Sequence, residues 1–466
     1  MSKKQIFEFI DNNEEMFSKI ARAIWEHPQM ALEETFASDL HAITLEEAGF
    51  RVTKGLRGLP TAVMAEYGEG RPVIGLLGEY DALDGLSQDS CAVRKPLVEG
   101  GPGHGCGHNL LGTGAMAAAI AVKKAIESGE ISGTVRYYGC PAEEELIGKT
   151  FMLRDGYFDD LDAALYWHPS SNNAPWKGSS LACISAVFTF RGLTAHAPQA
   201  HLGRSALDAV EIMDIGANYL REHLPRTVLM HYSILGNHIA PNTVPDRCQV
   251  WYMMRAPKRA ELDAAFARLK EVARGAAIIT GTEVQSVEII GSGNDVNANS
   301  ALGDLMGKNM QECGGPRFTE EDYEYGRKIT ALFTEDQLVN GARAFSVPME
   351  HLHDVFEIGV NPMPEGFMQP MSVDLDMSWI LPVGGANCAT WPIGVFTHTW
   401  QATACTGTAV GYHGMLFAAK TLAGTVYDLM HDSEEMKKVT EEFEASKADH
   451  EYVCPLSHES VPHRVK

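Results

Sequence analysis

The stretch GRPVIGLLGEYDAL (residues 70–83) is an apolar run that ends in acidic residues, a pattern typical of a buried strand leading into a polar loop. The alanine-rich segment NLLGTGAMAAAIAVKKAIESG (109–129) predicts a helix with Asn109 as its N-cap. Two further strand-like runs, 133–145 and 161–169, end in carboxylates and in a histidine. This alternation predicts an open α/β sheet whose polar residues gather past the carboxyl ends of the strands.

The order of predicted elements changes between residues 182 and 292. Strand, helix, strand, strand, helix and strand follow one another, which is the βαββαβ order of a ferredoxin-like module. A chain of 466 residues is also too long for one ordinary core. We therefore predict an α/β domain in two parts, 1–181 and 293–466, that is interrupted by a ferredoxin-like domain over 182–292.

The ends of the chain and the region after the insertion give weaker signals. The stretch 293–370 reads as irregular, sheet-type sequence resumes over 371–384, and 413–432 predicts a closing helix. The N-terminal residues 1–17 indicate an amphipathic helix and not a signal peptide. No apolar run approaches the roughly 20 residues needed to span a bilayer.

Composition restricts the possible partners and the compartment. With 38 basic and 61 acidic side chains, the formal charge is −23, which opposes nucleic acid and anionic membranes as partners. A small anionic substrate remains possible, since one local arginine can outweigh the distant field. The nine scattered cysteines include no CxxC pair, so we expect reduced thiols and a cytoplasmic protein.

Four predicted loops carry side chains of the types that bind metal ions. They contribute a thiol, three histidines and a run of three carboxylates: Cys106 and His108, then Glu143, Glu144 and Glu145, then His168, and finally His398. Thiolate, imidazole and carboxylate together bind first-row divalent ions such as zinc or manganese. The thiol, the three histidines and one of the carboxylates would make five ligands, which exceed the four positions of one zinc ion. This number favours two ions that share ligands. Of two adjacent carboxylates, one can bind metal while the other acts as general base.

Two other interpretations of these loops remain open. A cysteine-nucleophile amidase could use Cys106 with a histidine, although the carboxylates would then have no role. A non-catalytic binding protein on the same scaffold would have little reason to keep a full ligand set beside a free carboxylate. The residues alone therefore favour a metal hydrolase.

Several motifs together resemble the aminoacylase/carboxypeptidase family of co-catalytic metallopeptidases. They are GHGCGHN, PAEE, WHP, AHAPQAHLGRSALDAV and HTW, and they match best the cysteine-containing amidohydrolase branch. The resemblance covers nearly the whole chain and is weakest between about 295 and 370. It implies a mixed-sheet, zinc-peptidase-like catalytic domain, an inserted dimerisation or lid domain, and two divalent metal ions.

The resemblance also implies roles for individual residues. Glu143 corresponds to the general base, and the implied metal ligands are Cys106, His108, Glu144, His168 and His398. His196 corresponds to a histidine that enters the active site of the partner and polarises the scissile carbonyl. Asn242 and Arg255 correspond to residues that bind the substrate carboxylate, which the planar fork of an arginine contacts at two points.

Two departures from the family pattern affect these assignments. Glu145 continues the acidic run where the family has glycine, so Glu144 as base with Glu145 as ligand is an alternative. Glu79 stands where the family usually has aspartate, while Asp81 keeps the second acidic position and is expected to support the site. Four nearby residues are expected to have structural roles: His104, His201, Trp400 and His413.

The expected reaction is hydrolysis of the amide in an N-acyl or N-aroyl amino acid. The resemblance alone prefers p-aminobenzoyl-glutamate, cleaved to p-aminobenzoate and glutamate, and so implies a role in folate catabolism. An aminoacylase, an indole-acetyl-amino-acid hydrolase or a dipeptidase would use the same machinery. Ligand softness favours zinc, the resemblance suggests manganese, and the expected assembly is a homodimer or a heteromer with a related subunit.

Overall fold

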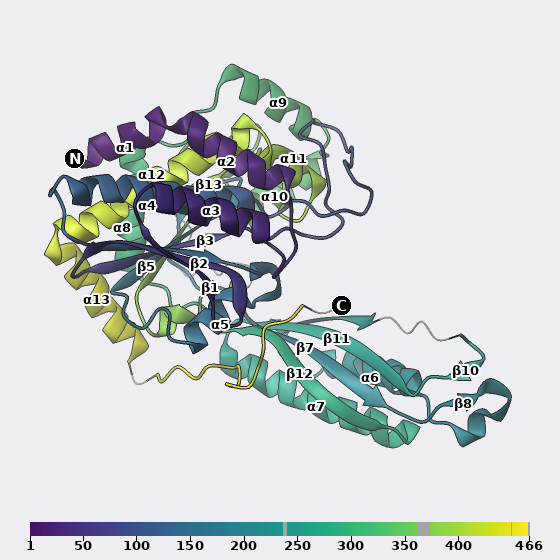
Figure 1. The fold of residues 1–466 in the computed structure, drawn as a ribbon. Helices are drawn as coiled ribbons and strands as arrows, with labels where there is room; N and C mark the ends of the chain where they lie inside the picture. The colour runs from purple at the N-terminus through teal and green to yellow at the C-terminus, as the bar shows by residue number, and fades with distance from the viewer. Residues whose placement is uncertain (236–239, 362–372, 449, 465–466) are drawn as a thin grey trace.

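The computed structural model describes residues 1–235, 240–361, 373–448 and 450–464. Figure 1 shows a larger α/β body and, below it, an elongated body formed by residues 182–293. The larger body contains a mixed sheet, and the elongated body is inserted into its chain between β6 and β13. The predicted fold class, an α/β mixed sheet with an inserted ferredoxin-like unit, is confirmed.

The larger body is built on a seven-stranded sheet. Its strand order is β1 (Arg51–Leu56), β2 (Leu59–Glu69), β4 (Gly133–Cys140), β3 (Val73–Glu79), β5 (Ala163–Ser170), β13 (Val383–Ala389) and β6 (Ala174–Pro175). The four central strands β4, β3, β5 and β13 are parallel, whereas β1, β2 and β6 pair antiparallel. The parallel strands therefore end at one common edge of the sheet, where ligand-binding loops gather in such folds.

One face of this sheet carries two layers of helices (Figure 1). The inner layer consists of α4 (His108–Glu127) and α12 (Ala409–His431), flanked by α3 (Thr35–Glu47) and α8 (Ser300–Cys313), and the outer layer consists of α1 (Lys3–Asn12) and α2 (Glu14–Glu26). Helix α4 packs closely on the end of β3, because a Cβ atom at Gly112 would lie 2.4 Å from the backbone oxygen of Glu79. Glycine at this position brings His108 beside the carboxyl end of β3.

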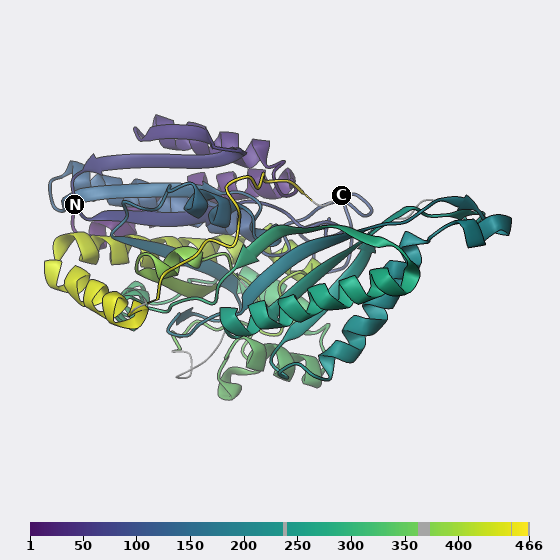
Figure 2. The ribbon, with the colours of Figure 1, turned by 90° about the horizontal axis from the view of Figure 1, so that it is seen from below.

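The elongated body has the strand order β12, β7, β11, β9, with every pairing antiparallel. In chain order its elements are β7 (Ala182–Arg191), α6 (Ala206–Arg221), β9 (Leu229–Leu235), β11 (Arg247–Ala256), α7 (Arg259–Thr280) and β12 (Glu283–Gly293). A short antiparallel pair, β8 (Ala195–His196) and β10 (Thr243–Val244), lies at the far tip of this body (Figures 1 and 2). The sequence analysis did not predict that pair, because two-residue strands carry no periodic signal.

Helix α4 begins two residues earlier than predicted. Its N-cap is Gly107, which has φ 80°, and Asn109 lies inside the first turn. The Asn109 amide donates hydrogen bonds to the backbone oxygens of Ala21 and Thr406, at 3.2 and 3.0 Å. The prediction of Asn109 as N-cap is therefore wrong, since this side chain joins α4 to two other helices instead of capping its own.

The region after the insertion is more regular than the sequence indicated. It contains α8, α9 (Glu320–Thr330) and α10 (Glu335–Ala344), of which the last two are short, largely exposed helices with capping boxes at Thr319 and Thr334. The prediction of sheet-type structure over 371–384 is also wrong for most of that range. A 3-10 helix occupies Asp376–Trp379, β13 begins at Val383, and residues 362–372 lie outside the described residues.

The closing helix was predicted over 413–432 and is observed as α12, which is followed by α13 (Ser433–Lys447). All nine cysteines are free thiols, as predicted. Among the described helices, none combines the length and the apolar character that crossing a membrane would require.

A buried histidine links α3 to the sheet and makes stability depend on pH. The Nδ1 atom of His41 lies 2.8 Å from the hydroxyl of Tyr137 on β4. Burial lowers the pKa of His41 to about 3, so the folded protein keeps this ring neutral while the unfolded chain takes up a proton near its ordinary pKa of about 6.5. This contribution to stability is therefore complete above pH ~6.5 and is lost as the pH falls towards 3.

We expect His41→Gln to reduce the pH dependence of unfolding. In the wild type, His41 should lower the free energy of unfolding by up to about 1.4 kcal/mol per pH unit below pH ~6.5. Denaturant unfolding of both proteins between pH 7.5 and 5 measures the two slopes. Equal slopes for the wild type and the variant would contradict the assignment.

Candidate functional site

The residues predicted to bind metal come together at the carboxyl edge of the parallel strands. Glu79 ends β3, with Asp81 in the loop that follows, and the turn Glu143–Glu145 follows β4. His168 lies within β5, whose partner β13 leads into the loop that carries His398. The sheet topology therefore gathers side chains from Glu79 to His398, which lie far apart in the sequence.

Asp81 holds two of these loops together. Its Oδ1 lies 2.9 Å from His108 Nδ1, and its Oδ2 accepts a hydrogen bond of 3.0 Å from the backbone N–H of Glu144. A carboxylate on Nδ1 fixes the orientation of the ring and leaves Nε2 for a metal ion. One buried side chain therefore orients His108 and positions the start of the carboxylate turn.

Two groups of side chains with metal-binding geometry share one thiol. Cys106, His108 and His168 form one group, and Cys106, Glu144 and His398 form the other, with the ligand atoms of each group within 4.8 Å of one another. The Cys106 Sγ lies 3.4 Å from His168 Nε2, and Glu144 Oε2 lies 3.3 Å from His398 Nε2. Such an arrangement would suit two divalent ions that share Cys106 as a ligand.

The buried polar atoms of the site support this assignment. Among the described residues, His108 Nε2 and Glu144 Oε1 are buried and have no hydrogen-bond partner. Buried polar atoms are normally hydrogen-bonded, and leaving them unpaired is costly. A cation bound by these atoms would remove that cost, so the donor set fits divalent metal ions.

The electrostatics of the site also favour the metal-binding form of the thiol. Burial and the nearby Glu144 act to raise the pKa of Cys106, but His108 and His168 outweigh them and lower it to about 6. For Glu144, burial again acts to raise the pKa, whereas His398 and His108 lower it to about 2. In contrast, burial, together with Glu79 and Asp374, raises the pKa of Glu143 well above its ordinary value. The adjacent carboxylates of Glu143 and Glu144 thus have different environments. Such a difference is expected when one carboxylate binds metal and its neighbour accepts a proton.

The turn that carries these carboxylates is locally strained. Ala142 and Leu146 on either side of it adopt left-handed backbone conformations, with φ values of 55° and 58°. Such strain persists only where surrounding contacts impose it. Glu34 Oε1 accepts the N–H of Ala142 at 2.9 Å, and Glu145 Oε1 pairs with Arg464 Nε of the C-terminal tail at 3.4 Å. Glu145 is not part of either metal-capable group described above.

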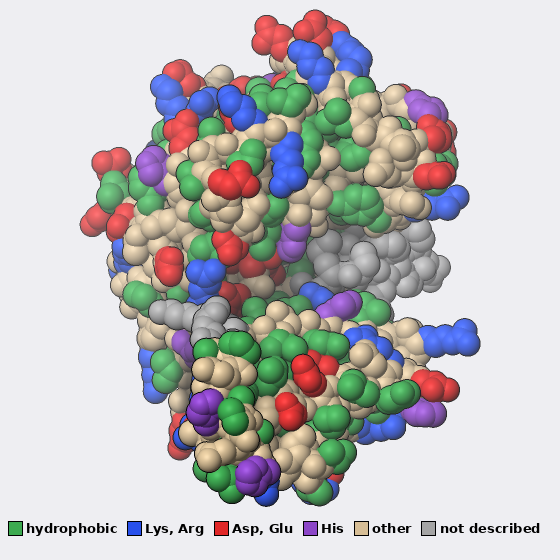
Figure 3. All heavy atoms as spheres, turned by 90° about the vertical axis from the view of Figure 1, so that its right-hand side faces the viewer, with side chains coloured by type: hydrophobic (Ala, Val, Ile, Leu, Met, Phe, Trp, Pro, Cys, Tyr) green, Lys and Arg blue, Asp and Glu red, His purple; other side chains and the backbone are tan. Residues whose placement is uncertain are grey.

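A pocket of about 530 Å³ opens beside these groups, between the two bodies. In Figure 3 the hollow between the upper and lower bodies exposes acidic and histidine side chains. The inserted body contributes Arg255, Leu229 and Met253 to its wall. Arg255 and Leu229 are directly paired across β11 and β9, so one sheet face presents a cation next to apolar side chains.

His196 and Asn242 lie away from this pocket in the same chain. Both are at the tip of the elongated body, where the N–H of Ala197 donates to the backbone oxygen of Asn242 at 2.9 Å and Thr243 pairs with His196. Both side chains are exposed. The chain therefore brings together the metal-binding candidates and Arg255, but not His196 and Asn242.

The nearby residues that were expected to be structural make ordinary contacts. His104 Nε2 lies 3.2 Å from the backbone oxygen of Ile24, and His413 Nδ1 lies 2.9 Å from Asp322. Trp400 packs against a small apolar cluster, and His201 is exposed. None of these residues belongs to the metal-capable groups found in the described part of the chain.

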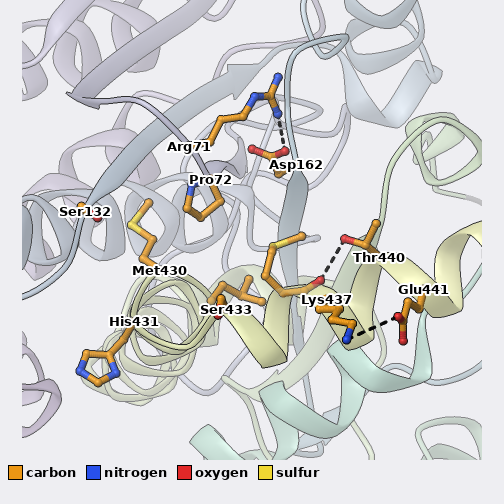
Figure 4. Close-up of a pocket in the computed structure, with 12 residues that line it drawn as sticks. Arg71, Pro72, Ser132, Asp162, Met430, His431, Ser433, Lys437, Thr440 and Glu441 are labelled. Atoms are coloured by element: carbon orange, nitrogen blue, oxygen red, sulfur yellow. Dashed lines mark hydrogen bonds and ion pairs between the residues drawn. The ribbon is translucent and has the colours of Figure 1, made fainter.

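A second groove, of about 620 Å³, lies between the Arg71–Pro72 turn and the α12–α13 region (Figure 4). Its charged groups pair with each other: Arg71 with Asp162, and Lys437 with Glu441. It contains no residue that the sequence predicted to be functional, so the pocket at the sheet edge is the candidate active site.

Several residues that surround the site were not predicted from the sequence. Lys149 is fully buried between Glu79 and Asp374, and Tyr166 donates a hydrogen bond to Glu79 Oε2. A lone lysine two residues before the apolar run FML (151–153) was an available signal for Lys149. Asp374 lies in the alternating apolar and polar stretch 371–378, where its position predicts only an exposed strand residue and not a buried one.

The chain matches the peptidase dimerisation domain of M20 peptidases over residues 182–279. It is 38% identical to a p-aminobenzoyl-glutamate hydrolase subunit of Escherichia coli (strain K12), over 99% of this chain and 100% of that protein. It is 27% identical to Xaa-Arg dipeptidase of Homo sapiens, over 96% of this chain and 93% of that protein. A dinuclear metal-binding peptidase of the M20 family from Bacillus subtilis shares the fold, with a TM-score of 0.54 and 16% identity over 90% of this chain and 99% of that one.

The sequence resemblance had indicated this family and, within it, the p-aminobenzoyl-glutamate hydrolases. The chain belongs to the M20 family of metal-dependent peptidases and amidohydrolases, and it is a hydrolase of amide bonds.

Proposed function

We propose that this enzyme cleaves N-aroyl amino acids, with p-aminobenzoyl-glutamate as the substrate and p-aminobenzoate and glutamate as products. The observation that carries the proposal is the pair of metal-capable groups that share Cys106, beside Glu143 and in one pocket with Arg255. The 38% identity to a p-aminobenzoyl-glutamate hydrolase subunit supports this substrate over a dipeptide or another N-acyl amino acid.

In this proposal Cys106, His108 and His168 hold one divalent ion, and Cys106, Glu144 and His398 hold the second. When bound, two such ions supply Lewis acidity and make a water molecule more acidic. Cysteine and histidine ligands favour zinc, whereas the carboxylate also suits manganese, and we propose that one of these two is the resident ion.

Glu143 is the proposed proton acceptor. Its carboxyl group is almost fully buried within the pocket lining, beside the metal-capable groups, so it is placed to take a proton from the attacking water. The same carboxyl then gives that proton to the leaving amine nitrogen as the amide C–N bond breaks. Glu144 as ligand is supported by its contact with His398, and Glu145 points to Arg464 instead.

The wall of the pocket fits the two ends of the proposed substrate. Arg255 offers a planar cation for a carboxylate of the glutamate portion. Leu229 and Met253 lie on the same wall and offer apolar contact for an aromatic ring. A substrate with one apolar end and one anionic end matches a wall that has apolar side chains beside an arginine.

We further propose that the active unit is at least a dimer, formed through the inserted body. Among the described strands β9 pairs only with β11, which leaves its other edge open, with Tyr232 and Ile234 exposed. Ile215 and Tyr219 on the neighbouring α6 are also exposed. Large exposed apolar groups beside an open strand edge favour pairing with another subunit, either a second copy or a related chain. Such pairing would carry His196 and Asn242 to the partner's pocket, where His196 would stabilise the developing oxyanion.

The free thiols suit the reducing cytoplasm, where we place this enzyme.

The first experiment measures glutamate release from p-aminobenzoyl-glutamate by the purified chain. We expect activity that is lost after chelation and restored by manganese or zinc. The reason is that the proposed reaction needs the ions that the Cys106, His108 and Glu144 groups would bind. Activity that survives complete chelation would overturn the metal mechanism and favour Cys106 as nucleophile. Metal-restored activity on dipeptides but not on the aroyl substrate would overturn only the substrate assignment.

Arg255→Ala should raise KM at least about tenfold with a smaller change in kcat, because it removes a charged hydrogen bond to the substrate carboxylate worth roughly 1.5–3 kcal/mol. Arg247→Ala is the matched control, since Arg247 is an exposed residue on the same strand and does not line the pocket. Steady-state kinetics of the three proteins test this. The same KM in wild type and Arg255→Ala would exclude Arg255 from substrate binding.

Mixing two inactive chains tests whether the site is shared. A His196→Ala chain keeps Glu143, and a Glu143→Ala chain keeps His196, so a mixed dimer has one complete site. After random exchange of subunits, half of the dimers are mixed, and each mixed dimer has one complete site of two. About a quarter of wild-type activity should therefore return if the interface is a symmetric dimer. A chain with both substitutions is the control, because it should restore neither partner. No recovery after demonstrated subunit exchange would argue against a shared site.

A further inference from the structure

Glu79 is a fully buried carboxylate whose two oxygens face different partners. Its Oε1 lies 2.5 Å from Lys149 Nζ. Its Oε2 accepts a hydrogen bond of 3.3 Å from the hydroxyl of Tyr166 and lies 3.3 Å from His108 Nε2. Lys149 thus fixes one side of the carboxylate, and the other side faces a histidine of the proposed metal site.

The charges around Lys149 do not balance. Its ammonium also pairs with Asp374, and its backbone N–H donates to Asp374 Oδ2 at 3.2 Å. Lys149, Glu79 and Asp374 are all buried without measurable side-chain exposure. One ammonium therefore faces two carboxylates, which leaves one net negative charge in a site from which water is excluded. Buried charge of this kind requires a partner, and a cation supplies it.

The geometry indicates where that cation would lie. Glu79, His108 and Glu143 form a third group whose ligand atoms lie within 4.8 Å of one another. His108 Nε2 is fully buried and has no hydrogen-bond partner, although Glu79 Oε2 is only 3.3 Å away. Asp81 fixes Nδ1 of the same ring, so Nε2 cannot turn away from Glu79 without breaking that contact.

We propose that Glu79 is a further metal ligand, which binds through Oε2 to the ion held by His108. This inference rests on the proposed function, since it assumes that His108 binds metal. A carboxylate oxygen added to thiolate and imidazole makes the ligand set harder and favours manganese more than zinc. Glu79 would therefore help to determine which ion the His108 side of the site retains, while Lys149 orients its carboxylate.

The test measures metal binding to the metal-free protein and does not depend on turnover. Calorimetric titration with Mn²⁺ and with Zn²⁺ compares the wild type with Glu79→Gln, which keeps the size of the side chain and removes its charge. We expect one Mn²⁺ site to weaken at least tenfold and the Zn²⁺ affinity to change less. Absorption spectra of the Co²⁺-loaded proteins should also differ, because the variant replaces a carboxylate ligand with a neutral amide, a much weaker ligand, while the Cys106 thiolate band persists.

Asp374→Asn is the matched control, because it disrupts the same buried ion cluster without touching the proposed ligand. Its metal affinities and Co²⁺ spectrum should match those of the wild type, and circular dichroism checks that both variants fold. Glu79→Asp is the second variant if Glu79→Gln does not fold. Its shorter side chain cannot span from Lys149 to His108, so it should also lose Mn²⁺ affinity.

Two outcomes would overturn the inference. One is an unchanged Co²⁺ spectrum and unchanged Mn²⁺ affinity in Glu79→Gln, and the other is an equal loss in Asp374→Asn, which would make Glu79 part of a structural ion cluster. In both cases a wild type that binds two ions leaves the proposed function intact. A wild type that binds no divalent ion would overturn the inference and the proposed function together.

Discussion

The two hydrogen bonds of the Asp81 carboxylate join the loops on which the site depends. One orients His108 at the start of α4, and the other positions the backbone of Glu144 in the turn after β4. Because α4 packs against β3 through Gly112, the helix, the strand and the carboxylate turn meet within one buried contact region. The loop that carries His398 is attached to the same region. The backbone N–H of His398 donates a hydrogen bond of 2.9 Å to the backbone oxygen of Gly105, next to Cys106.

The site concentrates negative charge where water cannot reach it. The structure offsets part of this charge with Lys149 and leaves buried donor atoms of His108 and Glu144 unpaired. A protein without a bound cation would gain nothing from such an arrangement, since each unpaired buried polar atom costs free energy of folding. Metal binding and the stability of this edge of the sheet are therefore linked, as is general for preformed metal sites.

The inserted body carries predicted site residues in two separate places. Its sheet face lines the pocket with Arg255 and Met253, whereas its tip holds His196 and Asn242 at the opposite end. The C-terminal tail spans both bodies, since Arg464 pairs with Glu145 and His463 lies 3.6 Å from Glu288 on β12 (Figure 2). The tail and the close approach of Gly291 to the backbone of Glu145 tie the orientation of the insertion to the position of the carboxylate turn.

The α/β class, the interrupted order of elements and the chemical types of the candidate site residues are all predictable from the amino-acid sequence. These features follow from local patterns: an apolar strand with acidic residues after it, an alanine-rich helix, and a βαββαβ run of alternating elements. Tertiary structure alone decided which distant residues meet, because strand order and parallel pairing bring Glu79, Glu144 and His398 to one edge. It also decided the roles of Lys149 and Asp374, and it placed His196 far from its own pocket. A single buried charge and a two-residue strand carry no periodicity, so the burial of Asp374 and the β8–β10 pair became apparent only in the packed chain.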